Sequence, residues 1–176
     1  MLDHKTQIRI VETDWGYFGV KIRSGSLCQT CLPLPNPSDV EHYLGLDDST
    51  PSTLEYSPQL NPALTDRIQA YYRGEPTNFL DVIPLDLSTF TPFGQAVLQA
   101  CHRLSYSETN TYGQLAQAVQ RPGAARAVGQ IMARNPIPLI IPCHRVIAAN
   151  HKLGGFSGPG GITAKQRMLS LENSEN

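Results

Sequence analysis

Cysteine, histidine and arginine follow one another at residues 143–145, so that a nucleophile, a base and a cation occur together. A thiol beside proton-accepting and cationic groups can have a lowered pKa and react as the thiolate, the form that attacks carbon electrophiles. The alternative is that Cys143 is a small buried hydrophobe, because free cysteine is among the most buried residue types. The presence of His144 and Arg145 favours the nucleophile.

The segment that must position this thiol is rich in proline, with Pro136, Pro138 and Pro142 inside seven residues. Proline disfavours helix at the residue before it and favours extended backbone. We therefore expect the apolar residues 139–141 to form a short buried strand that ends next to Cys143.

Four motifs of the chain resemble the O6-alkylguanine-DNA alkyltransferases, also called methylated-DNA–protein-cysteine methyltransferases. They are I-P-C-H-R-V at residues 141–146, T-Y-G-Q-L-A at 111–116, A-A-R-A-V-G at 124–129 and G-G-F-S-G at 154–158. One such motif would be a hypothesis, whereas four in order at similar spacing make a specific signal. The resemblance covers about residues 84–172, with a fainter match before them.

The resemblance implies direct repair of O6-alkylguanine, and of O4-alkylthymine, by irreversible transfer of the alkyl group to Cys143. His144, oriented by Glu172 and acting through a water, would take the thiol proton. Tyr112 would donate to guanine N3, and Lys165 would assist on the thiolate side. The product is a thioether, a poor leaving group, so each molecule should act once. Pattern alone leaves Glu172 open to another interpretation, a solvated charge near a helix end.

A glycine-rich segment at residues 152–161 holds five glycines in ten residues. It is either a flexible surface loop or a lid over a flat base. The resemblance favours a lid, in which Phe156 stands where tyrosine is commoner and the Ser157 backbone binds the base. It also assigns the Val146 backbone to the base edge, and Asn135 to a hinge between the active-site strand and the recognition helix.

Two helices joined by a tight turn are expected in the second half of the chain. Thr111 and Gln114 have the spacing of a capping box that opens a helix over residues 112–119. A second helix over residues 124–134 is rich in small residues. The pair is either a DNA-binding helix-turn-helix or an ordinary helical hairpin, and pattern alone does not decide between them.

The resemblance favours DNA contact, with the second helix in the minor groove, where small residues permit close approach. Because the target atom is buried in a duplex, the base must be flipped out, and Arg126 would fill the vacated stack. The residues that the resemblance assigns to DNA binding are Arg126, Ala125, Ala127, Gly129 and Arg134.

Charge divides the chain into two halves of opposite sign. Residues 1–90 contain six Lys or Arg and twelve Asp or Glu. Residues 91–176 contain eight Lys or Arg and three Asp or Glu. A basic half is what a polyanion-binding surface requires. The cations that we expect on this surface are Arg121, Arg126, Arg134, Arg145 and Lys152.

The expected fold is α+β in two domains, residues 1–85 and 86–176. Alternating β-formers between residues 7 and 32 predict a small antiparallel sheet. It is followed by a helix near 38–46, a polar loop over 47–58 and a helix near 61–73. With its helix, this domain is expected to be RNase H-like. The second domain is expected to be mostly helical, with the helix-turn-helix and the active-site loop.

Two further helices are expected in the second domain. Thr91 and Pro92 predict the start of a helix that buries Cys101 in the core. Thr163 and Gln166 have capping-box spacing and predict a last helix over residues 163–171, which places Lys165 and Glu172 on one face.

The C-x-x-C at Cys28 and Cys31 is half of a zinc site, a redox pair, or two ordinary strand residues. A zinc site needs two more ligands, and His4 and His42 lack a finger-like spacing. We expect ordinary strand residues, no metal and no organic cofactor.

The expected partner is double-stranded DNA that contains O6-alkylguanine, bound by a monomer. No apolar run approaches the ~18 residues of a membrane span, and the N-terminal residues lack the apolar core of a signal peptide. We therefore expect no membrane contact and a location in the bacterial cytoplasm, or in the nucleus of a eukaryote.

Two other classes of function fit parts of the pattern. A lesion sensor that binds and flips the base without chemistry would share the fold, but such sensors replace the cysteine. A Cys-His hydrolase would place its base far from the cysteine in sequence, whereas His144 is adjacent to Cys143.

Overall fold

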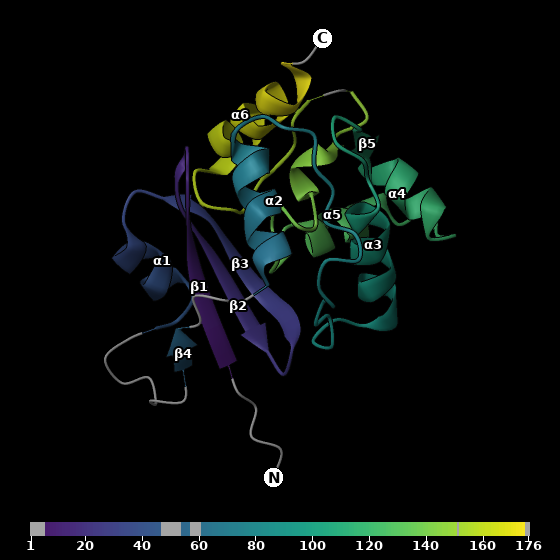
Figure 1. Ribbon diagram of the computed structural model, residues 1–176. Coiled ribbons are helices and arrows are strands. Elements are labelled where there is room, and N and C mark those ends of the chain that lie inside the picture. The colour runs from purple at the N-terminus through teal and green to yellow at the C-terminus, as the bar shows by residue number, and fades with distance from the viewer. Residues whose placement is uncertain (1–5, 47–53, 57–60, 151, 175–176) are drawn as a thin grey trace. The chain divides into compact units, whose positions relative to one another are not determined.

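The chain divides into two compact units, Met1–Asp86 and Leu87–Asn176, of which the computed structural model describes residues 6–46, 54–56, 61–150 and 152–174 (Figure 1). A sheet with helices forms the first unit, and the second is mostly helical. The α+β class is therefore confirmed. His4 and most of the loop expected over residues 47–58 lie outside the described residues.

The sheet of the first unit is built on the expected antiparallel strands. β1 (Thr6–Thr13) pairs with β2 (Gly16–Arg23), which pairs with β3 (Ser26–Leu34). A fourth strand, β4 (Leu54–Tyr56), runs parallel to β1, where the sequence predicted only loop. Three residues in a polar context carry too little periodicity to predict a strand, so this expectation was wrong.

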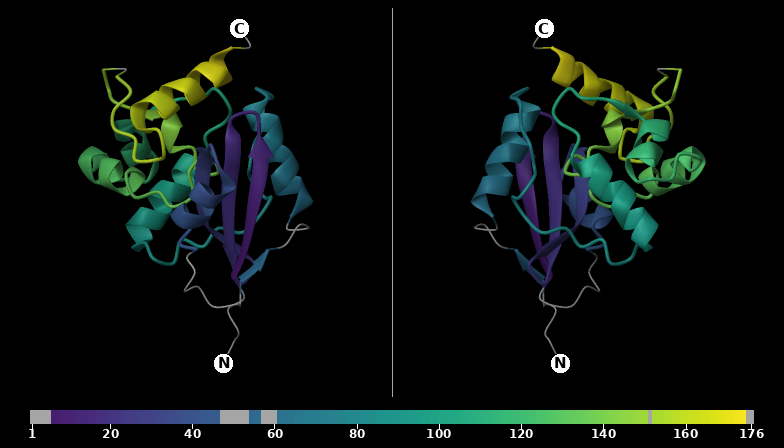
Figure 2. Two further views of the ribbon diagram at one scale, coloured as in Figure 1. Left: turned by 90° about the vertical axis from the view of Figure 1, so that its left-hand side faces the viewer. Right: turned by 90° about the vertical axis from the view of Figure 1, so that its right-hand side faces the viewer.

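Helices cover both faces of this sheet (Figure 2). On one face Phe18 packs against Tyr72 of α2 (Pro62–Tyr72), with ring centroids 6.0 Å apart. On the other, a Cβ at the neighbouring Gly19 would lie 2.5 Å from Val40 Cγ1 of α1 (Pro37–Tyr43). Only glycine lets α1 approach β2 this closely.

Cys28 and Cys31 both lie in β3, as expected. Cys31 is fully buried, and burial raises its pKa to about 12. Burial also raises the pKa of Cys28, whose Sγ donates to the Lys21 carbonyl oxygen at 3.3 Å. Neither thiol is therefore activated. In the described part of the chain no three His, Cys, Asp or Glu side chains cluster as metal ligands would.

The second unit contains four α-helices among its described residues, and one short pairing that the sequence did not predict. The helices are α3 (Pro92–His102), α4 (Tyr112–Ala118), α5 (Ala125–Met132) and α6 (Gly161–Asn173). β5 (Asn110–Thr111) runs parallel to β6 (Val146–Ile147), which joins the start of α4 to the chain just after the thiol. Two-residue strands leave no periodic pattern in a sequence.

The strand expected over residues 139–141 is wrong, although these residues are buried as expected. The chain turns instead: Leu139 has φ +73°, and the Ile141 N–H donates to the Ile137 carbonyl oxygen at 2.9 Å. Pro136, Pro138 and Pro142 have no N–H to donate to a ladder, so a sheet cannot satisfy this segment.

The last helix begins earlier than expected. α6 starts at Gly161, preceded by Gly160 with φ +81°, and no side chain caps it. Thr163 is therefore the third helical residue, and the predicted capping box at Thr163 and Gln166 is wrong. The predicted face is confirmed, since Lys165 and Glu172 are both buried.

The described residues include no helix that is both long and apolar enough to cross a bilayer.

The two threonines with capping-box spacing give a matched test of the fold. Thr111 Oγ1 accepts from the Gln114 N–H at 3.1 Å, and the Gln114 side chain accepts from the Thr111 N–H at 2.7 Å. Thr111→Val should lower the free energy of unfolding by about 1 kcal/mol, because an N–H of α4 loses its acceptor. Thr163→Val should change it by only a few tenths of a kcal/mol. Equal losses in chemical denaturation would contradict the assigned helix starts.

Candidate active site

Cys143 lies at the start of a single 3₁₀ turn, η1 (Cys143–Arg145), directly after the proline-rich turn. Asn135 braces that turn from both sides: its Nδ2 donates to the Ile141 carbonyl oxygen at 2.9 Å, and its Oδ1 accepts from the Ile137 N–H at 3.1 Å. His102 Nδ1 lies 2.8 Å from the Ile140 carbonyl oxygen and must donate, because a carbonyl only accepts. Side chains thus replace the missing strand as the support of the thiol.

His144 and Glu172 meet in the interior of the second unit. His144 Nε2 lies 2.6 Å from Glu172 Oε1, and both side chains are almost fully buried. Although burial opposes it, hydrogen bonds and charge from His144 and Arg145 lower the pKa of Glu172 to about 2. Glu172 is therefore an ionised carboxylate that accepts a hydrogen bond from the Nε2–H of His144. It is not a solvated charge near a helix end.

Arg145 is not on the surface, so its predicted place in a polyanion-binding patch is wrong. It is 4% exposed, with Nε 2.9 Å from Glu172 Oε2 and Nη2 3.0 Å from Glu172 Oε1. Nη1 donates to the Leu104 carbonyl oxygen at 2.7 Å. The planar fork of arginine matches a carboxylate, and a buried carboxylate requires such a partner.

The pKa of Cys143 is raised from its usual value near 9.0, so the lowered value expected from the sequence is wrong. Burial is the main cause, and the Asn135 side chain, Lys165 and backbone N–H groups offset it in part. Burial likewise lowers the pKa of His144 from 6.5. The resting pair is therefore a neutral thiol beside a neutral imidazole, which suits proton transfer during the reaction.

Lys165 is fully buried on α6, and its Nζ donates to the Val146 carbonyl oxygen at 2.6 Å. Burial lowers its pKa, while Cys143 acts in the opposite direction. Lys165 therefore supports the backbone three residues after the thiol and contributes positive potential to it.

A cavity of about 380 Å³ opens beside the thiol, between α4, α5 and the glycine-rich loop. Its lining residues are Tyr112, Gly129, Met132, Ala133, Cys143, Gly155, Phe156 and Ser157. Five of these were predicted from the sequence. The other three, Met132, Ala133 and Gly155, were not predicted from the sequence. The only feature of the sequence that could have indicated them is that they lie next to predicted residues of the second helix and of the glycine-rich loop. Val146 and Asn135 are not among the lining residues; they support the turn behind it.

The glycine-rich loop is held against α4 and α5. The Ser157 hydroxyl donates to the carbonyl oxygen of Ala133 at 2.7 Å. Gly154 has φ +69°, and a Cβ there would lie 2.9 Å from the Tyr112 hydroxyl oxygen. A larger residue at this position would push Tyr112 away from the cavity, so glycine is required.

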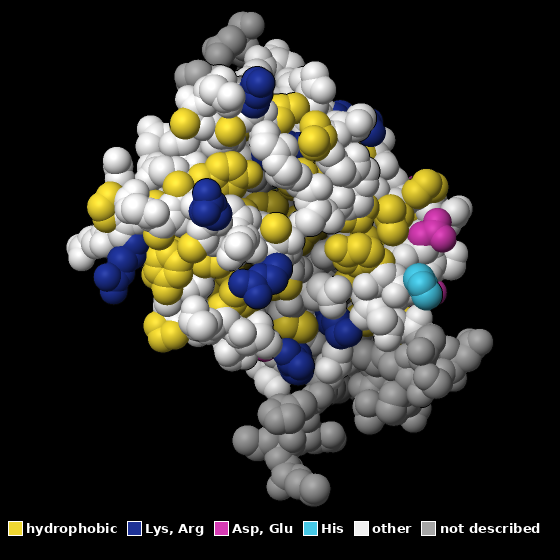
Figure 3. All heavy atoms as spheres, turned by 180° about the vertical axis from the view of Figure 1, so that it is seen from behind, with side chains coloured by type: hydrophobic (Ala, Val, Ile, Leu, Met, Phe, Trp, Pro, Cys, Tyr) yellow, Lys and Arg dark blue, Asp and Glu magenta, His cyan; other side chains and the backbone are white. Residues whose placement is uncertain are grey.

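The small residues predicted for DNA contact lie along α5, and none of them is fully buried. Ala125, Ala127 and Gly129 are half-buried, and Arg126 and Arg134 are exposed. Arg134 also donates to the Gln130 carbonyl oxygen at 3.4 Å. On the face drawn in Figure 3, Lys and Arg side chains stand among hydrophobic ones and acidic side chains are sparse.

Comparison with known proteins identifies relatives. Residues 92–174 match the family described as 6-O-methylguanine DNA methyltransferase, DNA binding domain. The methylated-DNA–protein-cysteine methyltransferase of Mycobacterium tuberculosis H37Rv is 47% identical over 109 residues, 62% of this chain and 63% of that protein. The constitutive Bacillus subtilis protein of that name is 42% identical over 106 residues, 60% and 62% of the two chains. The chain thus matches just under two thirds of the length of these curated relatives.

The crystal structure of Mycobacterium tuberculosis OGT in complex with DNA superposes with a TM-score of 0.73 at 34% identity. This likeness covers 96% of the present chain and 93% of the mycobacterial one. It therefore extends over both units, beyond the part matched by the family description.

Because the pKa of Glu172 is lowered in the folded chain, the free energy of unfolding depends on pH. A carboxyl whose pKa is lower in the folded chain stabilises it above the unfolded pKa, here near 4.5, and loses this contribution as the pH falls toward 2. The contribution at neutral pH is roughly 3 kcal/mol. Glu172→Gln should lower the melting temperature at pH 7, and the difference from the wild type should shrink between pH 4.5 and 2.

Glu41→Gln, at an exposed carboxylate of α1, is the control and should melt like the wild type at every pH. A Glu172→Gln protein that lost the same stability at pH 2 as at pH 7 would show that Glu172 acts by shape and not by charge.

Proposed function

The chain belongs to the O6-alkylguanine-DNA alkyltransferase family, the methylated-DNA–protein-cysteine methyltransferases, and from this we propose that it repairs O6-alkylguanine in DNA by transferring the alkyl group irreversibly to Cys143. One observation carries the proposal. The thiol opens on a cavity of about 380 Å³, and the residue after it is a buried histidine held at 2.6 Å by a carboxylate. A cavity of this kind shields an alkyl-transfer reaction from bulk water.

The transfer is a displacement at the alkyl carbon. A bond forms between Cys143 Sγ and the alkyl carbon while the bond from that carbon to O6 breaks. His144 accepts the thiol proton, through a water, and the Glu172 carboxylate stabilises the imidazolium that forms. Tyr112, in the cavity wall, donates a hydrogen bond to guanine N3 and stabilises the departing guanine anion. That anion takes up one proton, which balances the proton lost by the thiol, and ends as guanine while His144 returns to its neutral form. The products are guanine and an S-alkylcysteine, and no cofactor takes part.

The same cavity would hold the base. Phe156 stacks on it and the Ser157 backbone binds near O6, while Lys165 holds the Val146 carbonyl at 2.6 Å behind the cavity. Asn135 acts as the hinge between α5 and the thiol-bearing turn, through its two hydrogen bonds to that turn. O4-alkylthymine presents a similar alkyl ether and would be a second substrate.

Double-stranded DNA with an alkylated base is the proposed partner, bound by a monomer. α5 enters the minor groove through Ala125, Ala127 and Gly129, and Arg134 contacts phosphate. Arg126, exposed on the same helix, fills the space left by the flipped base. This substrate places the protein with the DNA, in the cytoplasm of a bacterium or the nucleus of a eukaryote. A sensor without chemistry is disfavoured, because Cys143 lines the cavity.

The nucleophile is tested by intact-protein mass spectrometry. Wild-type protein incubated with a methylated duplex should gain one methyl group per chain, and peptide mapping should place it on Cys143. Cys143→Ala should gain none while it still binds the duplex. Cys101→Ala, at a buried thiol in α3, is the matched control and should react like the wild type. An adduct on Cys28, Cys31 or Cys101 would overturn the assignment.

The role of Arg126 is tested by comparing substrates. Arg126→Ala should slow repair of a saturating duplex at least ~10-fold, because unstacking a base costs a few kcal/mol. Its rate with the free base O6-benzylguanine should not change. Arg134→Ala should instead weaken duplex binding, with the rate recovering at higher DNA concentration or lower salt. Equal losses on duplex and free base would mean that Arg126 has a structural role.

A further inference from the structure

The Glu172 carboxylate receives more donors than its partnership with His144 requires. Oε1 accepts from His144 Nε2 at 2.6 Å and from Arg145 Nη2 at 3.0 Å. Oε2 accepts from Arg145 Nε at 2.9 Å and from the Ser107 backbone N–H at 3.1 Å. A carboxylate held from both sides cannot rotate, so His144 always meets the same oxygen.

Arg145 is itself fixed by the connection between α3 and β5. Its Nη1 donates to the Leu104 carbonyl oxygen at 2.7 Å, and its guanidinium carbon lies 5.8 Å from the centroid of the Tyr106 ring. Ser107, with φ +63°, directs its N–H to the Glu172 carboxylate and its hydroxyl to the Glu172 carbonyl oxygen. Residues 104–107 therefore clamp both Arg145 and the end of α6.

We infer that Arg145 is a positioning residue for the alkyl transfer: it fixes and neutralises the Glu172 carboxylate, so that His144 is oriented but stays an uncharged proton acceptor for Cys143. The inference rests on the proposed transfer to Cys143. It assigns the third residue of the C-H-R sequence a task that neither Cys143 nor His144 performs.

The neutralisation matters because a lone buried carboxylate would draw a proton onto its imidazole neighbour. Besides burial, which lowers the His144 pKa most, the charged groups that act on this ring include Glu172, which raises its pKa, and Arg145 and Lys165, which lower it. Of the two cations, Arg145 contacts Glu172 directly, with its Nε 2.9 Å from Glu172 Oε2. Without it, we expect the His144 pKa to rise, and a protonated histidine cannot accept the thiol proton.

The test is the pH dependence of single-turnover transfer from the free base O6-benzylguanine, which avoids effects on DNA binding. Wild-type rates should be flat across the neutral range and fall only below pH 6.5. In Arg145→Gln this fall should move up by about one pH unit. On the acid side of the fall, the variant should therefore react up to ~10-fold more slowly than the wild type at the same pH, each rate being taken relative to its own plateau.

Arg145→Lys keeps the positive charge but loses the planar guanidinium. The pH at which the rate falls should therefore shift by less than in Arg145→Gln, and this variant is used if Arg145→Gln does not fold. Arg167→Gln, at an exposed arginine of α6, is the matched control and should overlay the wild type. If the transfer rate of either Arg145 variant were lower than that of the wild type by the same factor at every pH, the inference would be overturned. Arg145 would then be a purely structural residue.

A second readout does not depend on transfer. Nitrogen NMR of His144, assigned by comparison with His144→Gln, should show a neutral ring with its proton on Nε2 in the wild type at pH 7 and a higher pKa in the Arg145 variants. Should wild-type protein fail to react with O6-benzylguanine, the proposed function fails, and this titration still decides the inference. An unshifted His144 pKa in both Arg145 variants would overturn it.

Discussion

The C-terminal unit depends on one ionised carboxylate that is almost shut off from water. Glu172 is 2% exposed, and burying an isolated charge is so costly that it persists only with matched partners. Those partners come from two parts of the chain: His144 and Arg145 belong to η1, and the Ser107 backbone belongs to the connection between α3 and β5. The carboxylate therefore does two tasks at once. It holds α6, η1 and residues 104–107 together, and it orients the imidazole beside the thiol.

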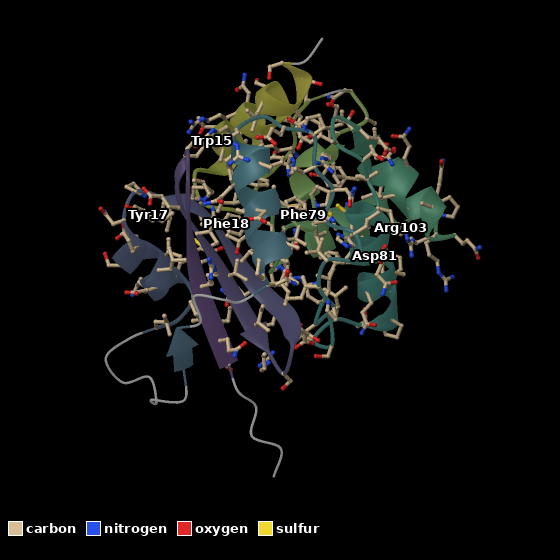
Figure 4. The ribbon with its side chains drawn as sticks, viewed as in Figure 1. Trp15, Tyr17, Phe18, Phe79, Asp81 and Arg103 are labelled. Atoms are coloured by element: carbon tan, nitrogen blue, oxygen red, sulfur yellow. The ribbon has the colours of Figure 1, made fainter. Side chains whose placement is uncertain are left out.

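The features that the sequence predicted correctly are those with local causes. The alternation that sends Tyr17 and Phe18 to opposite sides of β2 is visible in the sequence as well as in the structure (Figure 4). Thr91 and Thr111 cap helices through atoms three residues away, so a short window contains the whole interaction. β4, β5 and β6 depend on partners far along the chain, and no local pattern records them.

The site divides in the same way. Motif spacing located Cys143, Tyr112 and the loop that lines the cavity. Motif spacing did not predict the surroundings of these residues correctly. Arg145 was expected on a basic surface, and the Cys143 thiol was expected to have a lowered pKa. Both errors have one cause, since burial is set by the packing of whole elements, and desolvation outweighs the neighbouring charges at Cys143. Residue types give the chemistry that is available, whereas packing determines the protonation states.

The distances along the chain between these partners have a consequence for folding. Ser107 and Glu172 are 65 residues apart, and Arg145 and Leu104 are 41 apart, so the contacts that complete the site close long loops. Closing such loops costs entropy before any contact forms, which delays them relative to the helices. During synthesis the cysteine emerges before Glu172 does. The newly made chain therefore has no carboxylate to orient the imidazole next to the thiol, and this arrangement forms only when α6 has docked.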